Sequence, residues 1–106
     1  MAVRIISDSE RNVMEYSGSK FYYRRISISK SMEINRNHTK RGLTDHIAAG
    51  LEMVEWCLLG WDNVEDENGN SVEFNKGLIR SLPDEIINEL TMVLRDATPG
   101  VNALGN

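Results

Sequence analysis

The feature that most constrains the fold is an amphipathic segment near the middle of the chain. Its apolar side chains recur at intervals of four, three, four and three residues, as on one face of an α-helix: Ile47, Leu51, Val54, Leu58 and Trp61. Thr44 or Asp45 supplies an N-cap, and Gly60 ends the pattern. The spacing therefore predicts a central core helix over residues 44–60. Cys57 lies beside the stripe and is predicted to be a buried small hydrophobe.

The segment before this helix carries weaker helical signals. Ser29 is a fair N-cap, and the basic pair Lys40-Arg41 followed by Gly42 is typical of a helix C-terminus. These signals predict a helix over residues 30–40. Because its apolar side chains are few, this helix is expected to pack weakly or to dock against another element.

The C-terminal part of the chain predicts a last helix, preceded by a short helical turn. Asn75 can cap the turn, which runs to Leu82, and Pro83 suits the first position of the helix that follows. The apolar stripe of this helix is Ile86, Leu90, Val93, Leu94 and Ala97. We expect the stripe to pack into the same core as the central helix.

The N-terminal part is rich in β-branched and aromatic residues. They fall into three groups: Val3, Ile5 and Ile6; Val13, Met14 and Tyr16; and the run FYYRRISI, residues 21–28. Residues 17–20, SGSK, are the predicted hairpin loop between the last two groups. This part therefore predicts a small antiparallel β-hairpin or meander, in which Arg24 and Arg25 protect an edge strand from pairing with other molecules.

Residues 60–74, GWDNVEDENGNSVEF, fit two interpretations. In a calcium loop of the EF-hand type, Gly69 at the sixth position places Val64 at the first, where an oxygen ligand is needed. Asn75 then occupies the twelfth position, which requires glutamate, so calcium binding is rejected. Asn68-Gly69 is instead the preferred pair for a tight type I′ turn. The segment predicts a short central hairpin with one apolar face: Trp61, Val64, Val72 and Phe74.

These elements define an α+β fold with three to four helices around one core. The length of 106 residues suits a single domain, expected over residues 1–98, with residues 99–106 as a flexible tail after Thr98-Pro99-Gly100. Cys57 is the only cysteine, which suits a reducing cytoplasm. No apolar run approaches the roughly 20 residues that a membrane span needs. We therefore expect a cytoplasmic protein without a membrane anchor.

Signatures of catalysis and of cofactor binding are missing from the sequence. His38 and His46 are eight positions apart, with no HxxxH, HExxH or CxxC motif near them. There is no glycine-rich phosphate loop and no GxSxG motif. The sequence therefore predicts no catalytic site, and it predicts neither a metal nor a cofactor.

Charge is distributed unevenly along the chain. Residues 1–50 carry a net charge of +4, whereas residues 51–106 carry −8. Such a division can reflect attraction between the halves of one fold, self-association between copies, an acidic protein partner or a nucleic acid. Nucleic acid is disfavoured because the whole chain is acidic and lacks a recognisable nucleic-acid-binding motif.

One basic segment is the candidate partner-binding surface. Residues 36–42, RNHTKRG, place several cationic or titratable side chains near a predicted helix end: Arg36, His38, Lys40 and Arg41. The aromatic and basic run at residues 22–25 adds a second group: Tyr22, Tyr23, Arg24 and Arg25. The alternative is a solvated helix C-terminus, where cations are favoured by the helix dipole.

Five short segments, in a fixed order, resemble a group of small phage and prophage tail proteins, the tail assembly chaperones. They are FYYRRI, RNHTKRG, a core helix ending in GWD, DENGNSVEFN and LPDEIINEL, and the similarity covers residues 21–94. Its most recognisable residues are Gly60, Trp61, Asn68, Gly69, Phe74 and Pro83.

This resemblance implies a non-enzymatic protein of the bacterial cytoplasm that binds the tape-measure and tail-tube proteins while a tail is assembled. Such a role needs apolar surface that is first exposed and later covered, and the candidates are Tyr22, Tyr23, Met32, Ile34, Met53 and Met92. Two alternatives remain: a structural minor tail or head–tail joining protein, and a small nucleic-acid-binding regulator that uses residues 36–41.

Overall fold

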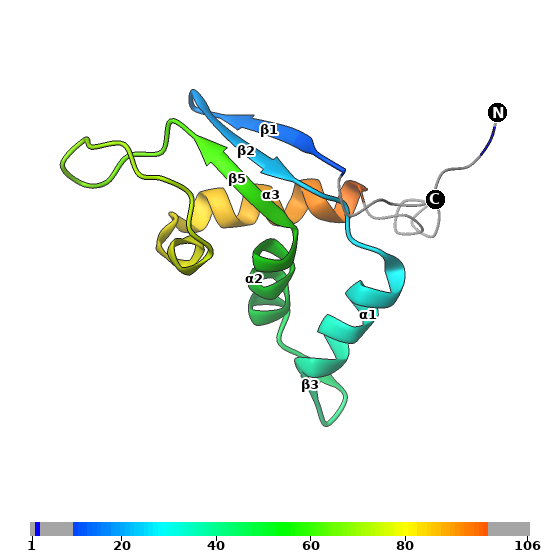
Figure 1. Cartoon of the computed structure of the whole chain (residues 1–106). Coiled ribbons are helices and arrows are strands. Elements are labelled where there is room, and N and C mark those ends of the chain that lie inside the picture. Colours follow the sequence, from blue (N-terminus) through cyan, green and yellow to red (C-terminus); the bar gives the residue numbers. More distant parts are fainter. Residues whose placement is uncertain (1, 3–9, 98–106) are drawn as a thin grey trace.

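The computed structural model describes residue 2 and residues 10–97. This part of the chain has the predicted α+β fold, with a small antiparallel sheet and helices packed against it (Figure 1). The elements in chain order are β1 (Asn12–Tyr16), β2 (Ser19–Tyr23), α1 (Ile28–Asn37), β3 (Thr39–Lys40), β4 (Leu43–Thr44), α2 (His46–Cys57), β5 (Leu58–Asp62), the 3₁₀ helix η1 (Lys76–Ser81) and α3 (Asp84–Ala97). The predicted strand at Val3, Ile5 and Ile6 and the predicted tail at residues 99–106 lie outside the described residues.

The main sheet has the order β1-β2-β5, and both pairings are antiparallel. The β1–β2 hairpin turns on only two residues, Ser17 and Gly18, which both have positive φ, at 51° and 85°. Two such residues match the twist of antiparallel strands in a type I′ turn. The predicted four-residue loop was therefore too long, because Ser19 and Lys20 already belong to β2.

Strand β2 ends at Tyr23, so the predicted strand through Ile28 was also too long. Because β2 lies in the middle of the sheet, the interpretation of Arg24 and Arg25 as guards of an edge strand was wrong. Ile28 instead begins helix α1.

The predicted helix over residues 44–60 divides into a helix and a strand. Asp45 caps α2 as predicted, and its side chain accepts a hydrogen bond of 3.1 Å from the Ala48 N–H. The helix ends at Cys57, and the next five residues pair with β2 as strand β5. Leu58 and Trp61 are buried, but they reach the core from the strand. Residues three apart face opposite sides of a regular strand, but the β2–β5 pairing has a register shift between Tyr22 and Tyr23, so both side chains reach the core. The helical spacing therefore did not reveal the change.

Helix α2 is also rotated relative to the predicted stripe. Its buried residues are Ala49, Gly50, Met53, Val54 and Cys57. Leu51 is only half-buried and Ile47 is 87% exposed, so the prediction that Ile47 lies in the core was wrong. Small residues explain the rotation, because a Cβ at Gly50 would lie 3.3 Å from the Thr91 methyl group. The missing side chain lets α2 approach α3 closely.

Helix α1 is shifted toward the N-terminus relative to the prediction of 30–40. Ser27 caps it, not Ser29, and its side chain accepts a hydrogen bond of 3.2 Å from the Lys30 N–H. The helix ends at Asn37, and the strands β3 and β4 form a small hairpin around Arg41 and Gly42, with φ of 53° and 79°. Glycine with positive φ suits both a helix end and a type I′ turn, so the sequence signal was ambiguous.

The central segment is a loop with a single bridge between Glu65 and Ser71, not a regular hairpin. The predicted type I′ turn was wrong, because Asn68 does not share the positive φ of Gly69. Asp66 organises the turn instead: its carbonyl accepts from the Gly69 N–H at 3.0 Å. Its carboxylate accepts from the N–H groups of residues 68 and 70, at 2.9 and 3.0 Å. Such side-chain capping of a turn is typical of aspartate.

The C-terminal elements agree with the prediction. The Asn75 side chain accepts a hydrogen bond of 2.8 Å from the Gly77 N–H at the start of η1, and Pro83 immediately precedes α3. Apolar residues from the sheet and the helices then form one cluster: Phe21, Ile26, Ile34, Ala49, Met53, Val54, Cys57, Leu58, Trp61, Ile79, Leu82, Ile86, Leu90 and Leu94. The helices therefore share one core, as predicted.

Candidate partner-binding surfaces

The predicted group at residues 22–25 makes contacts within the molecule. The Arg25 guanidinium donates two hydrogen bonds to the Glu10 carboxylate, at 2.7 and 2.9 Å. This pairing lowers the pKa of Glu10 and raises the pKa of Arg25. The Tyr22 hydroxyl donates to the Asp62 carboxylate, which raises the pKa of that tyrosine. The Tyr22–Asp62 contact therefore joins β2 to β5, and the Arg25–Glu10 pair joins the segments that flank the β1–β2 hairpin.

The Glu10–Arg25 pair predicts a pH dependence of stability. Because the folded pKa of Glu10 is depressed, its contribution is present above the unfolded pKa of about 4.3 and is lost as pH falls through the folded value. Glu10→Gln is expected to lower the free energy of unfolding by about 1 kcal/mol or less at neutral pH, since the pair is partly exposed. Urea denaturation at neutral and acidic pH checks this, and a difference that persists fully in acid contradicts it.

The Arg24 side chain packs against the C-terminal end of helix α2. There it contacts Trp56, an exposed tryptophan that was not among the predicted site residues. Its guanidinium is 4.2 Å from the centre of the Trp56 ring and donates to the Trp56 carbonyl at 3.2 and 3.3 Å. The Lys30 ammonium lies 4.5 Å from the centre of the same ring. Lys76 donates to the Glu55 carbonyl at 2.7 Å. These cations satisfy the negative end of the helix dipole, so this cluster stabilises the end of α2.

The predicted basic segment is divided by the structure. His38 caps α1, and its Nε2 lies 2.9 Å from Glu52 Oε1 of α2, which ties the two helices together. Arg36 remains on α1, whereas Lys40 and Arg41 lie on the hairpin of β3 and β4. All three are exposed, and none forms an ion pair within the part of the chain that the structure describes. The prediction that the three share one helix end was wrong, because α1 ends at Asn37.

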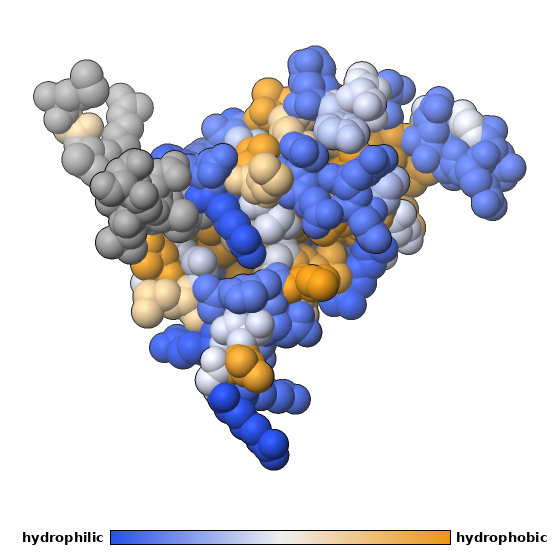
Figure 2. All heavy atoms as spheres, turned by 180° about the vertical axis from the view of Figure 1, so that it is seen from behind, coloured by the Kyte–Doolittle hydropathy of each residue, from blue (hydrophilic) through white to orange (hydrophobic). Residues whose placement is uncertain are grey.

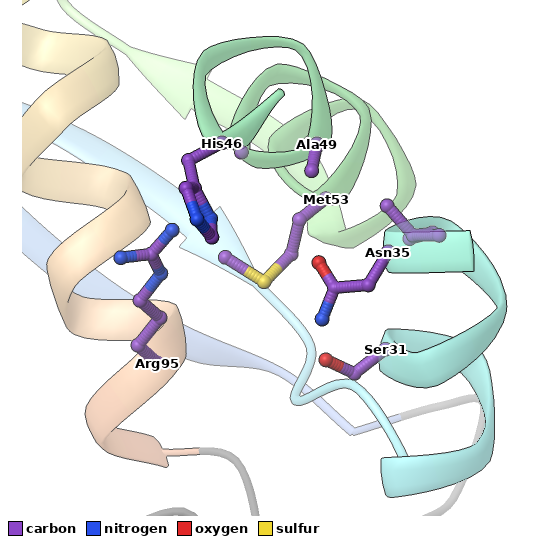
Figure 3. A pocket seen from close by; sticks show the side chains of 8 residues that line it. Ser31, Asn35, His46, Ala49, Met53 and Arg95 are labelled. Atoms are coloured by element: carbon purple, nitrogen blue, oxygen red, sulfur yellow. The ribbon is translucent and has the colours of Figure 1, made fainter. Parts of the chain in front are cut away.

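A hollow of about 270 Å³ opens between α1, α2 and α3 (Figure 3). Its apolar lining is Ile34, Ala49, Gly50 and Met53. Ser31 and Asn35 point from α1 toward the Met53 side chain, while His46 and Arg95 approach from the other side (Figure 3). We call this feature the helix hollow. The sequence could not reveal it, because its lining comes from three separate helices.

The three helices around the hollow also carry exposed apolar side chains: Met32 on α1, Ile47 on α2 and Met92 on α3. Figure 2 shows apolar patches between polar ones on one face of the molecule. Among the other predicted apolar candidates, Ile34 and Met53 are buried, and Tyr22 and Tyr23 are half-buried. The predicted methionines thus fall into two classes, with Met53 inside the hollow and two on the surface.

Cys57 is fully buried, as predicted, and burial raises the pKa of its thiol to about 12. The thiolate is the reactive form, so the folded protein should react very slowly with thiol reagents at neutral pH. We expect iodoacetamide to label Cys57 rapidly only after denaturation with urea, as measured by mass spectrometry. Complete labelling of the native protein within minutes would contradict this burial.

The residues that mark the family resemblance have structural roles. Trp61 packs edge-on between two rings, with centroid distances of 6.4 Å to Phe21 and 5.0 Å to Phe74. Its indole N–H donates to the Val72 carbonyl at 2.8 Å, which fixes the central loop to the sheet. Gly60 is buried beside it in β5, and Gly69 supplies the positive φ of the turn. Together these residues join the sheet to the central loop.

Within residue 2 and residues 10–97, no group of three or more metal-ligating side chains gathers. No helix in that same part of the chain has the length and apolar character needed to cross a membrane. The chain matches no known protein family, and neither a curated protein nor a solved structure is significantly similar to it.

Proposed function

We propose that this chain is a non-enzymatic tail assembly chaperone of a phage or prophage, acting in the host cytoplasm on tape-measure and tail-tube proteins. The observation that carries the proposal is the helix hollow, with its apolar floor and polar rim. The resemblance of residues 21–94 to such chaperones supplies the partners. The hollow supplies a place where an apolar side chain of a helical partner fits.

The size and lining of the hollow favour a protein partner over a small molecule. Its volume of about 270 Å³ falls below the range of roughly 300–1,000 Å³ that is usual for small-molecule sites. Met53 forms part of the floor, and an unbranched thioether adapts to side chains of different shape. A helix that places apolar residues in a groove needs only one or two such anchor points.

The rim of the hollow adds polar contacts around this floor. His46 and Arg95 face it from α2 and α3, and Asn35 faces it from α1 (Figure 3). These groups can pair with polar residues that flank the apolar stripe of an amphipathic helix. Ile47, on the same helix α2, is a further exposed apolar side chain. A surface on which apolar and polar side chains alternate in this way can shield a long helical protein until its final partners bind it.

Co-expression with the tape-measure protein of the same genome tests the proposal. We expect the tape-measure protein to become soluble when this chain is present and to co-purify with it. Purified virions should lack the chain, whereas a minor tail or head–tail joining protein would remain in them. A tape-measure protein that stays insoluble, or a chain that binds DNA in a salt-dependent gel shift but not the tape-measure protein, would overturn the proposal.

A further inference from the structure

Two projections of the molecule carry opposite charges. One is the hairpin at residues 39–44, which we call the basic knob. The other is the loop at residues 63–73, which borders a groove next to η1 and the start of α3. Figure 1 shows the hairpin and the loop projecting from different corners of the molecule. The two features therefore do not meet within one copy.

The basic knob presents an apolar side chain beside two cations. Lys40 and Leu43 are directly paired across the hairpin, so their side chains lie on the same face. The Leu43 side chain is 76% exposed. Arg41 occupies the turn. The knob thus presents one exposed apolar side chain beside two positive charges.

The groove has the opposite character. Its volume is about 580 Å³, and apolar residues line much of it: Trp61, Val64, Val72, Leu78, Leu82 and Pro83. Glu65, Asp66 and Glu67 lie along its border with the loop. No Lys or Arg occurs between residues 62 and 75 to neutralise them. We call this feature the acidic groove.

Intramolecular contacts leave these two charges uncompensated. Lys40, Arg41, Glu65 and Glu67 form no ion pair within the part of the chain that the structure describes. A second copy of the chain can supply the opposite charge to each of them.

We propose that copies of this chain associate head to tail, with the basic knob of one copy in the acidic groove of the next. Leu43 then covers the apolar floor, while Lys40 and Arg41 face Glu65 and Glu67. Such a contact joins two different surfaces, so it builds a ring or an open chain of copies. It uses none of the residues that line the helix hollow, so the hollow stays available in every copy.

Charge-reversal variants test this contact by sedimentation velocity. The wild-type chain should associate more as its concentration rises at about 0.1 M salt and dissociate at about 1 M, where the screening length falls to about 3 Å. The double variant Lys40→Glu/Arg41→Glu and the double variant Glu65→Lys/Glu67→Lys should each be monomeric. Their mixture should associate again, since each knob then meets a groove of opposite charge. Asp66 is left unchanged because its carboxylate holds the turn.

Two controls complete the design. Glu89→Lys on α3 reverses an acid outside the groove and should leave association unchanged. Leu43→Ser should weaken association without changing the melting temperature, because the side chain is exposed. Restored association in the mixture also shows that both reversed variants are folded. A wild-type chain that stays monomeric at low salt, or association that the reversals leave unchanged, would overturn the proposal.

Discussion

Replacing Trp61 with alanine is expected to destabilise the fold by about 3–5 kcal/mol. The side chain is 7% exposed, packs against two aromatic rings, and donates the hydrogen bond that holds the central loop. Its removal leaves a cavity between β2, β5 and the loop and an unpaired Val72 carbonyl. Urea denaturation followed by circular dichroism measures the change in the free energy of unfolding.

Trp61→Phe serves as the matched variant, because it keeps an aromatic ring but removes the indole N–H. Its cost should be clearly smaller than that of the alanine variant, and it includes about 0.5–1.5 kcal/mol for the lost hydrogen bond. A cost below about 1 kcal/mol for Trp61→Ala, as is usual at surface positions, would contradict the place of this residue in the core.

The second large effect is expected for Leu90→Ala on α3, at about 2–5 kcal/mol. Leu90 is fully buried in the common core. Ile47→Ala on α2 is the comparison, because the apolar stripe in the sequence predicts burial for both residues. The structure exposes Ile47, so its replacement should change stability by no more than about 0.5 kcal/mol. Denaturation of the two variants under the same conditions gives both changes in the free energy of unfolding. Equal changes would contradict the exposure of Ile47 on α2.

These two residues show what the sequence could predict about the fold. Periodicity located α3 correctly, because Leu90 belongs to an apolar stripe that recurs along the helix. Around α2 the same signal was misleading. Leu58 and Trp61 continued the helical spacing while belonging to a strand, and the small residues Ala49 and Gly50, not the large Ile47, face the core. Periodicity reports where apolar residues recur, but the packing of α2 against α3 decides which of them are buried.

The candidate surfaces were less predictable, for a related reason. The pairing of Arg25 with Glu10 and the stacking of Arg24 on Trp56 join residues far apart in sequence, and no local motif announces them. The helix hollow likewise depends on the angles between three helices. Only the positive charge of Lys40 and Arg41 could be read directly from the sequence. Their position on a hairpin could not.

The central claim, that the helix hollow holds a helical segment of the tape-measure protein, is tested most directly by filling the hollow. Asn35→Arg places a longer side chain at its rim, and Asn88→Arg makes the same change at an exposed position of α3 outside it. The measurement is the dissociation constant for a synthetic peptide that spans a helical segment of the tape-measure protein. We predict that Asn35→Arg weakens binding at least about tenfold, or about 1.4 kcal/mol, while Asn88→Arg binds like the wild type. Equal binding by both variants would contradict the claim.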